Sequence, residues 1–138
     1  MNRRTFLISA SLISALALVG LTGCAGKPSN NGAGAEPYQQ VDAETAKEIM
    51  DTEEGYVVLD VRTQDEYDEG HIPGAVLMPH DTVATVAEDT LTDKDQLLLV
   101  YCRSGNRSKL ASQALADLGY SNVVEFGGIN SWPYDIER

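Results

Sequence analysis

Apolar and polar residues alternate in blocks through residues 37–138, and these blocks predict short strands separated by helices. The run from Tyr56 to Leu59 has no polar residue at alternate positions, which is typical of a strand buried on both faces of a parallel sheet. Further strands are predicted at residues 38–41, 75–78, 97–101 and 122–126. Strands that alternate with helices predict an α/β domain with a mainly parallel central sheet.

Helical spacing and capping residues predict helices in the segments between these strands. Asp42 is expected to cap the first helix, and Gly55 is expected to end it. A short helix is predicted from Thr63 to Gly70, and residues 81–88 have weak helical character. The clearest helical pattern runs from Arg107 to Leu118.

Two polar side chains are expected at one edge of the predicted sheet. Asp60 ends the strand that begins at Tyr56, and Cys102 follows the strand predicted at residues 97–101. Sites in open parallel sheets lie at the carboxyl ends of the strands. The sequence therefore predicts that Asp60 and Cys102 lie at the same edge.

Residues 1–23 predict a secretory signal peptide rather than part of the domain. A basic start precedes an apolar stretch at residues 6–21, which is short for a membrane-spanning helix. The sequence Leu21-Thr22-Gly23-Cys24 resembles a bacterial lipobox, which implies cleavage before Cys24 and lipid on that residue. An uncleaved membrane anchor is the alternative. Residues 2–7 also resemble a twin-arginine signal, so the export route stays open.

The predicted lipoprotein is expected at a membrane, outside the cytoplasm, held by lipid on Cys24. Residues 24–36 are mostly small or polar and predict a flexible linker to a domain at residues 37–138. Ala25 after the lipidated residue favours the outer membrane in a cell that has two. Which membrane and which face the protein occupies stay open.

The net charge limits the expected partners. The whole chain carries 10 Lys and Arg against 21 Asp and Glu, and loss of Arg3 and Arg4 with the signal peptide leaves a net charge of −13. This acidity argues against nucleic acid and against electrostatic attraction to anionic lipid. An anionic substrate would need a locally basic site, and Arg103, Arg107 and Lys109 supply one.

Cys102 is the candidate nucleophile. With Cys24 assigned to lipid, Cys102 has no partner for a disulfide within the chain. Its position between a buried strand and a helix start favours the reactive thiolate. If the substrate carries sulfur and its leaving group is an anion, no general base is required. His71 is therefore assigned to a turn and His80 to a loop after a strand.

The loop after Cys102 is the candidate binding site for whatever the sulfur carries. Its backbone N–H groups and its two arginines would stabilise negative charge, and its glycine permits the positive φ that an anion-binding loop needs. We expect neither a cofactor nor a metal. The residues of this loop are Arg103, Ser104, Gly105, Asn106 and Arg107.

Seven motifs follow one another between about Tyr38 and Trp132: Leu59–Arg62, Glu66–Tyr67, Gly70–Ala75, Tyr101–Ser108, Leu118–Tyr120, Gly127–Ile129 and Trp132. In this order they resemble a single-domain rhodanese, a rhodanese-like sulfurtransferase. The resemblance covers nearly all of the predicted domain. It implies a three-layer fold in which helices flank a mainly parallel central sheet.

The resemblance also implies a reaction. Cys102 would take sulfane sulfur from a small anionic donor such as thiosulfate, become a persulfide, and pass the sulfur to a thiophilic acceptor. The backbone from Arg103 to Arg107 would cradle the persulfide, and the two arginines would attract the donor. The acceptor could be a small molecule or a protein. The natural donor and acceptor and the oligomeric state stay open.

The rhodanese motif Asp-x-Arg corresponds to Asp60 and Arg62. Both are expected to support the loop without touching substrate. Arg62 is expected to pair with Asp65 or Glu66 at the surface.

Three other functions remain to be weighed. Related phosphatases and arsenate reductases place five residues between Cys and Arg, whereas four separate Cys102 from Arg107, and this shorter loop favours a single sulfur atom over phosphate. A non-catalytic or sulfide-sensing binding module is possible on the same fold, although inert versions commonly lose the cysteine. The third is a persulfide carrier that delivers sulfur to a partner protein.

Overall fold

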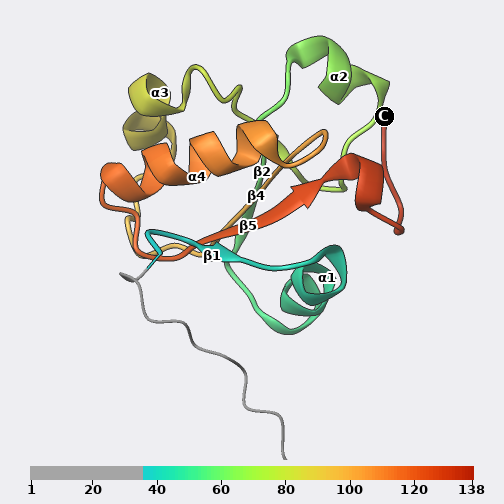
Figure 1. Ribbon diagram of the computed structural model, residues 1–138, viewed down its shortest axis with the longest axis horizontal. Coiled ribbons are helices and arrows are strands. Elements are labelled where there is room, and N and C mark those ends of the chain that lie inside the picture. Colours follow the sequence, from blue (N-terminus) through green and yellow to red (C-terminus); the bar gives the residue numbers. More distant parts are fainter. Residues whose placement is uncertain (1–35) are drawn as a thin grey trace, which may run out of the picture. The chain divides into compact units, whose positions relative to one another are not determined.

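The computed structural model describes residues 36–138 (Figure 1). The predicted signal peptide, Cys24 and all of the predicted linker except Glu36 lie outside the described residues. Within the described part, no helix has the length and apolar character needed to cross a membrane.

The described chain is built on a five-stranded sheet in which every neighbouring pair of strands is parallel. The strand order is β1-β5-β4-β2-β3. The strands are β1 (Gln39–Gln40), β2 (Val57–Asp60), β3 (Val76–Leu77), β4 (Leu98–Cys102) and β5 (Val123–Gly128). The predicted α/β fold with a parallel central sheet is confirmed, and all five predicted strands are present.

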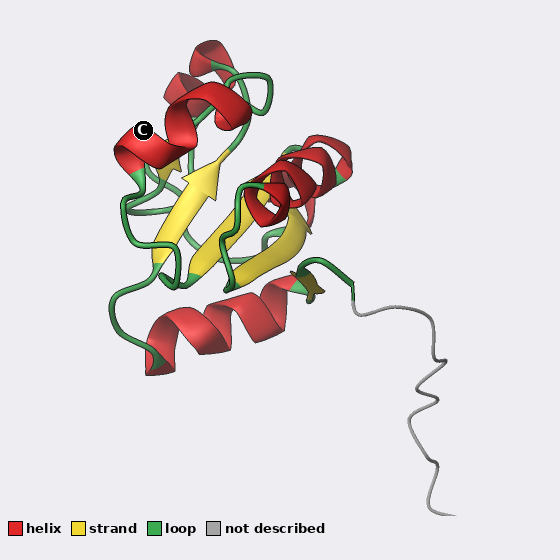
Figure 2. Ribbon diagram, turned by 90° about the vertical axis from the view of Figure 1, so that its left-hand side faces the viewer, coloured by secondary structure: helices red, strands yellow, loops and turns green. Residues whose placement is uncertain are grey.

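Helices cover both faces of the sheet and make the three-layer arrangement that the resemblance implies. On one face lie α3 (Val83–Thr90) and α4 (Asn106–Asp117). On the other lie α1 (Ala43–Thr52) and the short 3-10 helix η1 (Ile129–Ser131). Figures 1 and 2 show α4 and α1 on opposite sides of the strands. The fifth helix, α2 (Gln64–Glu69), follows the carboxyl end of β2.

The start of α1 has the predicted cap, and the structure adds a capping box at the start of α2. The Asp42 carboxylate accepts a hydrogen bond from the backbone N–H of Thr45 at 2.8 Å, as an N-cap does. Thr63 and Glu66 form a reciprocal capping box at the start of α2, and Gly70 ends that helix. The first helix ends at Thr52, ahead of the predicted glycine, and Gly55 lies in the turn that follows.

Alternation along β4 decides which way its polar end points. The side chains of Leu98, Val100 and Cys102 pack on the face covered by α3 and α4. Leu99 and Tyr101 pack on the opposite face, with α1 and Trp132. Successive strand residues point to opposite faces. The thiol of Cys102 therefore faces α4, and the ring of Tyr101 faces away from it.

Candidate active site

Cys102 is the last residue of β4, and its side chain is buried against the start of α4. The chain turns sharply between them because Gly105, the N-cap of α4, has a φ of +103°, in the left-handed region that favours glycine. This turn directs the Gly105 backbone N–H at the Cys102 Sγ, 3.0 Å away. The sulfur therefore sits at a helix N-terminus, where negative charge is favoured.

Hydrogen-bond donors around the sulfur favour its thiolate form. Burial on its own raises the pKa of the Cys102 thiol, but donors outweigh it and the net pKa is below the usual value. The donors are the Ser108 hydroxyl and the backbone N–H groups of Ser108, Gly105 and Ser104. Hydrogen bonds to the charged form lower the pKa of an acid. The loop is thus suited to hold a sulfur anion.

The end of β5 and the turn that follows it pack against the loop after Cys102. The Arg103 carbonyl accepts a hydrogen bond from the Asn130 backbone N–H at 3.2 Å. Gly128 lies so close to this peptide that a Cβ atom on it would come within 2.2 Å of the Arg103 carbonyl oxygen. Only glycine fits there without displacing backbone. Gly128 of the predicted Gly127–Ile129 motif therefore has a direct steric role at the loop, whereas at Gly127, which has a positive φ of +87°, a Cβ would make only an ordinary van der Waals contact.

The two arginines of the loop have different surroundings. The Arg107 guanidinium donates hydrogen bonds to both carboxylate oxygens of Glu66 on α2, at 2.7 and 2.8 Å. This pairing lowers the pKa of Glu66 to about 2. Arg103 is exposed and lines a pocket of about 240 Å³ together with Arg62, Glu66 and Asn130, among others. Of the two cations, Arg103 is the more accessible to an incoming anion.

Asp60 and Arg62 pair with each other on the face of the sheet opposite the sulfur. Both are buried, and Arg62 Nη2 lies 2.6 Å from Asp60 Oδ2 and 2.7 Å from the Gly70 carbonyl oxygen. The Tyr101 hydroxyl donates to Asp60 Oδ2 at 2.6 Å and accepts from the Ile72 backbone N–H at 3.1 Å. The expected pairing of Arg62 with an acidic residue of α2 is wrong, because Asp60 holds its guanidinium.

The carboxyl ends of β2 and β4 lie at the same edge of the sheet, as the sequence predicts. Asp60 is opposite Tyr101 in the β2–β4 register, one residue before Cys102. Asp60 therefore shares the hydrogen-bond network of the residue that precedes the sulfur, and that is how it can support the loop.

Two residues beside the sulfur were not among the predicted site residues. The Ser108 Oγ lies 3.5 Å from Cys102 Sγ and 2.6 Å from Oε1 of Glu125 on β5. Glu125 is buried and also accepts a hydrogen bond from the Gly127 backbone N–H at 2.8 Å. A signal for Glu125 is present in the sequence, since it is the one charged residue within the apolar strand Val123–Phe126.

The histidines lie where the sequence places them. The His71 ring stacks on Tyr67 with 3.7 Å between ring centroids, in the turn after α2. His80 lies in the loop after β3, where its backbone N–H donates to the Val61 carbonyl at 3.0 Å.

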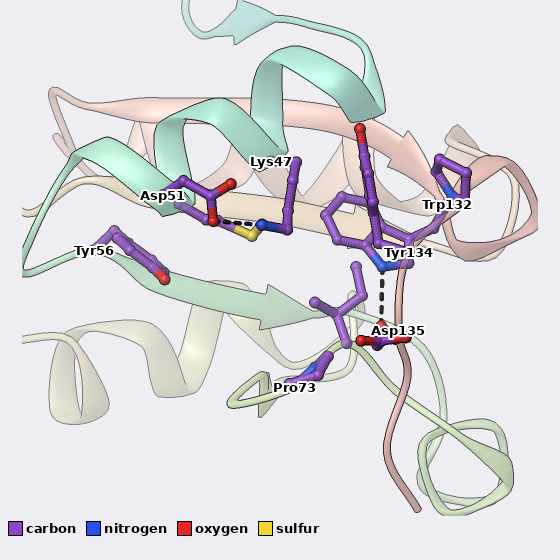
Figure 3. Close-up of a pocket in the computed structure, with 10 residues that line it drawn as sticks. Lys47, Asp51, Tyr56, Pro73, Trp132, Tyr134 and Asp135 are labelled. Atoms are coloured by element: carbon purple, nitrogen blue, oxygen red, sulfur yellow. Dashed lines mark hydrogen bonds and ion pairs between the residues drawn. The ribbon is translucent and has the colours of Figure 1, made fainter.

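Figure 3 shows a larger pocket, of about 430 Å³, which Cys102 does not line. It is lined by Lys47 and Asp51 of α1 and by aromatic side chains that include Tyr56, Trp132 and Tyr134. These residues belong to the α1 face of the sheet, whereas the thiol faces α4. This pocket therefore lies on the face of the sheet opposite the Cys102 thiol.

Comparison with known proteins gives one family. Residues 42–134 match the family model described as the rhodanese-like domain. The thiosulfate sulfurtransferase PspE of Escherichia coli is 32% identical over 71 residues, which cover 51% of this chain and 68% of PspE. YrkF of Bacillus subtilis, provisionally named a sulfur carrier protein, is 32% identical over 99 residues, which cover 71% of this chain and 52% of YrkF.

Solved structures agree with this match. A crystal structure of a rhodanese-related protein from Thermoplasma volcanium has a TM-score of 0.62 and 30% identity, and the match covers 72% of this chain and 98% of that one. Some curated relatives are much longer. The chain spans 21% of UBA4 of Meyerozyma guilliermondii, an adenylyltransferase and sulfurtransferase that is 38% identical over 92 residues and matches 60% of this chain.

Proposed function

The chain belongs to the rhodanese-like domain family, and from this membership and the Cys102 loop we propose that it is a sulfurtransferase. The donor we propose is a small anion with a sulfane sulfur, such as thiosulfate, and the acceptor is a thiophilic nucleophile. The observation that carries the proposal is the Gly105 N–H directed at Cys102 Sγ from 3.0 Å, within a loop that lowers the pKa of the thiol.

In the first half-reaction the Cys102 thiolate attacks the outer sulfur of thiosulfate. A bond forms between Sγ and that sulfur, the sulfur–sulfur bond of the donor breaks, and sulfite leaves with its electron pair. The product is a persulfide that carries the negative charge on its outer sulfur. Because the leaving group is an anion, the step needs no proton donor. The backbone N–H groups around the loop stabilise the persulfide charge as they do the thiolate.

In the second half-reaction a nucleophile such as cyanide attacks the outer sulfur of the persulfide. The bond from that sulfur to Cys102 Sγ breaks, and Sγ takes the electron pair and becomes a thiolate again. Thiocyanate leaves. The negative charge stays within the reach of the loop throughout the cycle, so one arrangement of donors serves both steps.

Thiocyanate formation from thiosulfate and cyanide tests this proposal. We expect turnover by the purified protein and its loss in Cys102→Ser. No turnover by the wild-type protein, with Cys102→Ser indistinguishable from it, would refute the catalytic role of Cys102 and favour a non-catalytic or sulfide-sensing binding module.

A persulfide carrier is the second candidate function, and the similarity to YrkF favours it. A carrier would accept one sulfur from thiosulfate and hold it until a partner protein arrives. Fast sulfur loading with slow release to cyanide distinguishes this function from turnover with a small acceptor. The buried position of Sγ, with 1% of Cys102 exposed, is compatible with such protected storage.

We also propose that the domain is a lipoprotein held outside the cytoplasm through Cys24, with residues 1–23 as a cleaved signal peptide. The support is the lipobox-like Leu21–Cys24 and the small, polar residues that follow it. Incorporation of a labelled fatty acid into the wild-type chain, and none into Cys24→Ala, is the expected result. Equal labelling of both would exclude Cys24 as the lipid site.

A further inference from the structure

The Glu125 carboxylate is buried beside the sulfur site without a cation. The residue is 2% exposed, and no ion pair of residues 36–138 includes it. Its side-chain hydrogen bonds in this range lead only to the Gly127 backbone N–H and the Ser108 hydroxyl. Burial of an ionised carboxylate without a cation is costly. Glu125 is therefore a buried carboxyl group whose negative charge no cation offsets within residues 36–138.

Ser108 connects this carboxyl group to the reacting sulfur. Its Oγ lies 2.6 Å from Glu125 Oε1 and 3.5 Å from Cys102 Sγ. Its other near neighbours are the carbonyl oxygens of Gly105 at 3.0 Å and Gly127 at 3.2 Å, which can only accept. A hydroxyl has a single proton to donate. Ser108 can therefore donate to only one of these four neighbours at a time, and Glu125 Oε1 is the nearest of them. A hydroxyl that donates to the sulfur cannot donate to Glu125 at the same time.

Two proton arrangements connect Cys102 to Glu125 through the Ser108 hydroxyl. With a neutral thiol, the S–H of Cys102 points to Ser108 Oγ, and the hydroxyl donates to an ionised Glu125. With a thiolate, a neutral Glu125 carboxyl group donates to Ser108 Oγ, and the hydroxyl donates to the sulfur. Both arrangements carry one negative charge, so conversion between them changes no net charge in the buried site.

We propose that Glu125 and Cys102 share one proton through Ser108, so that Glu125 takes up the proton that Cys102 loses when it becomes the nucleophile. The S–H bond breaks and its proton passes to Ser108 Oγ, while the hydroxyl proton passes to Glu125 Oε1. The electron pair stays on sulfur. Glu125 is thus a positioning residue and proton store, and Ser108 is the group that touches the reacting atom.

The other titratable groups near the site form no ion pair with Glu125 within residues 36–138. Tyr38 before β1 lies close enough to Glu125 for the carboxylate charge to help raise its pKa, after the larger effect of burial. Arg107 on α4 is bound to Glu66, and Asp60 is held by Arg62 across the sheet. The helix α1 packs on the opposite face. The Ser108 bridge is the hydrogen-bonded route from Cys102 to a carboxyl group.

Proton storage has a consequence for an anionic donor. A dianion such as thiosulfate must approach a site that already holds a thiolate. When Glu125 is neutral, the donor approaches a site with one buried negative charge fewer than when Glu125 is ionised. The inference rests on the proposed nucleophilic role of Cys102, but its tests need no sulfur donor. Failure of sulfur transfer and failure of proton sharing are therefore separable.

Proton release on alkylation tests the proposal. In the full chain with Cys24→Ser, Cys102 is the only thiol, and its ultraviolet absorbance reports the thiolate. Iodoacetamide is added at a pH where the absorbance shows that Cys102 is fully ionised, so that no released proton comes from a remaining thiol, and a pH-indicator dye counts protons. We expect one proton released per alkylated Cys102, because Glu125 ionises once the neighbouring charge is gone. Glu125→Gln should release none, and Ser112→Ala, one helical turn from Ser108, should behave as wild type.

Two results would overturn the inference: no proton release in the protein with Glu125, or equal release with Glu125→Gln. Infrared difference spectroscopy gives a second measurement that does not depend on folding of the Glu125→Gln variant. A protonated carboxyl band should be present when the thiolate is present and absent in Cys102→Ser at the same pH. A band that is unchanged by loss of the thiol, or absent in both proteins, would also exclude proton sharing.

Discussion

Both carboxylate oxygens of Glu66 accept hydrogen bonds from the Arg107 guanidinium, at 2.7 and 2.8 Å. This pair joins α2 to the first turn of α4, 41 residues further along the chain. Arg107 is thereby held as part of the frame around the sulfur loop. Its positive charge still acts on Cys102, while Arg103 is exposed and is the more accessible cation.

The Glu66–Arg107 pair should make stability depend on acid pH. The pKa of Glu66 falls from 4.5 to about 2 in the folded protein. Because the folded-state pKa is lowered, the stabilisation is complete above about pH 4.5 and is lost as the pH falls toward 2. Glu66→Gln should lower the free energy of unfolding at pH 7 by roughly 1 kcal/mol, and the difference should shrink in acid. Urea denaturation at a series of pH values measures this.

Asp65→Asn is the matched control, since Asp65 is an exposed acid in the same helical turn. It should show a smaller change at pH 7. A Glu66→Gln effect that stays constant from pH 7 to the acid end would mean that the ion pair is not its source.

Arg103 should matter for the encounter with an anionic donor. Arg103→Ala should raise the Michaelis constant for thiosulfate about three- to tenfold, equivalent to roughly 1 kcal/mol, and the ratio should fall at high salt. Lys109→Ala removes an exposed cation from α4 as a control and should have less effect. Steady-state kinetics at two ionic strengths distinguishes them. Equal effects of both substitutions would indicate only a general loss of positive charge.

Two serines of α4 offer a matched pair of substitutions. Ser108 and Ser112 are both fully buried and lie one turn apart, but Ser112 Oγ has no hydrogen-bond partner within residues 36–138. Ser108→Ala should raise the pKa of Cys102 and slow its alkylation at neutral pH, because a donor to the thiolate is lost. Ser112→Ala should leave alkylation unchanged and be neutral or stabilising by about 0.5 kcal/mol. Similar alkylation profiles for the two variants would mean that the Ser108 hydroxyl does not stabilise the Cys102 thiolate.

Gly128 should be the least replaceable glycine near the loop. A Cβ there would lie 2.2 Å from the Arg103 carbonyl oxygen, so Gly128→Ala should displace the loop and slow Cys102 alkylation several-fold. Gly119→Ala is the control, because that position has a φ of +92° but open space around it. It should cost about 1–2 kcal/mol of stability through backbone strain while leaving alkylation unchanged. Normal alkylation in folded Gly128→Ala would contradict this role.

Local sequence signals were sufficient to predict the order of strands and helices. Unbroken apolar runs identified β2 and β4, and the Asp42 cap placed the start of α1 correctly. Parallel topology then put Asp60 and Cys102 at one edge. What the sequence could not give was the register: Asp60 is opposite Tyr101, and the side chains of Asp60 and Cys102 therefore point to opposite faces.

Long-range pairing was the part of the site beyond sequence reasoning. Glu66 and Arg107 are 41 residues apart in the sequence, and Ser108 and Glu125 are 17 residues apart. Each contact therefore depends on how the elements pack in the folded chain. The Arg62 guanidinium was expected to pair with Asp65 or Glu66 of α2. It pairs with Asp60, which is buried beside it and only two residues away in the sequence. A lone glutamate in an apolar strand was the one sequence sign that such a contact existed.

The persulfide itself is the most direct test of the proposed function. The full chain with Cys24→Ser is incubated with thiosulfate, and mass spectrometry of the peptide that contains Cys102 follows the modification. We predict a mass gain of one sulfur atom on Cys102, its loss when cyanide is added, and no gain in Cys102→Ser. An unmodified Cys102 after incubation, with the protein folded and the thiolate present, would contradict the proposed sulfur transfer.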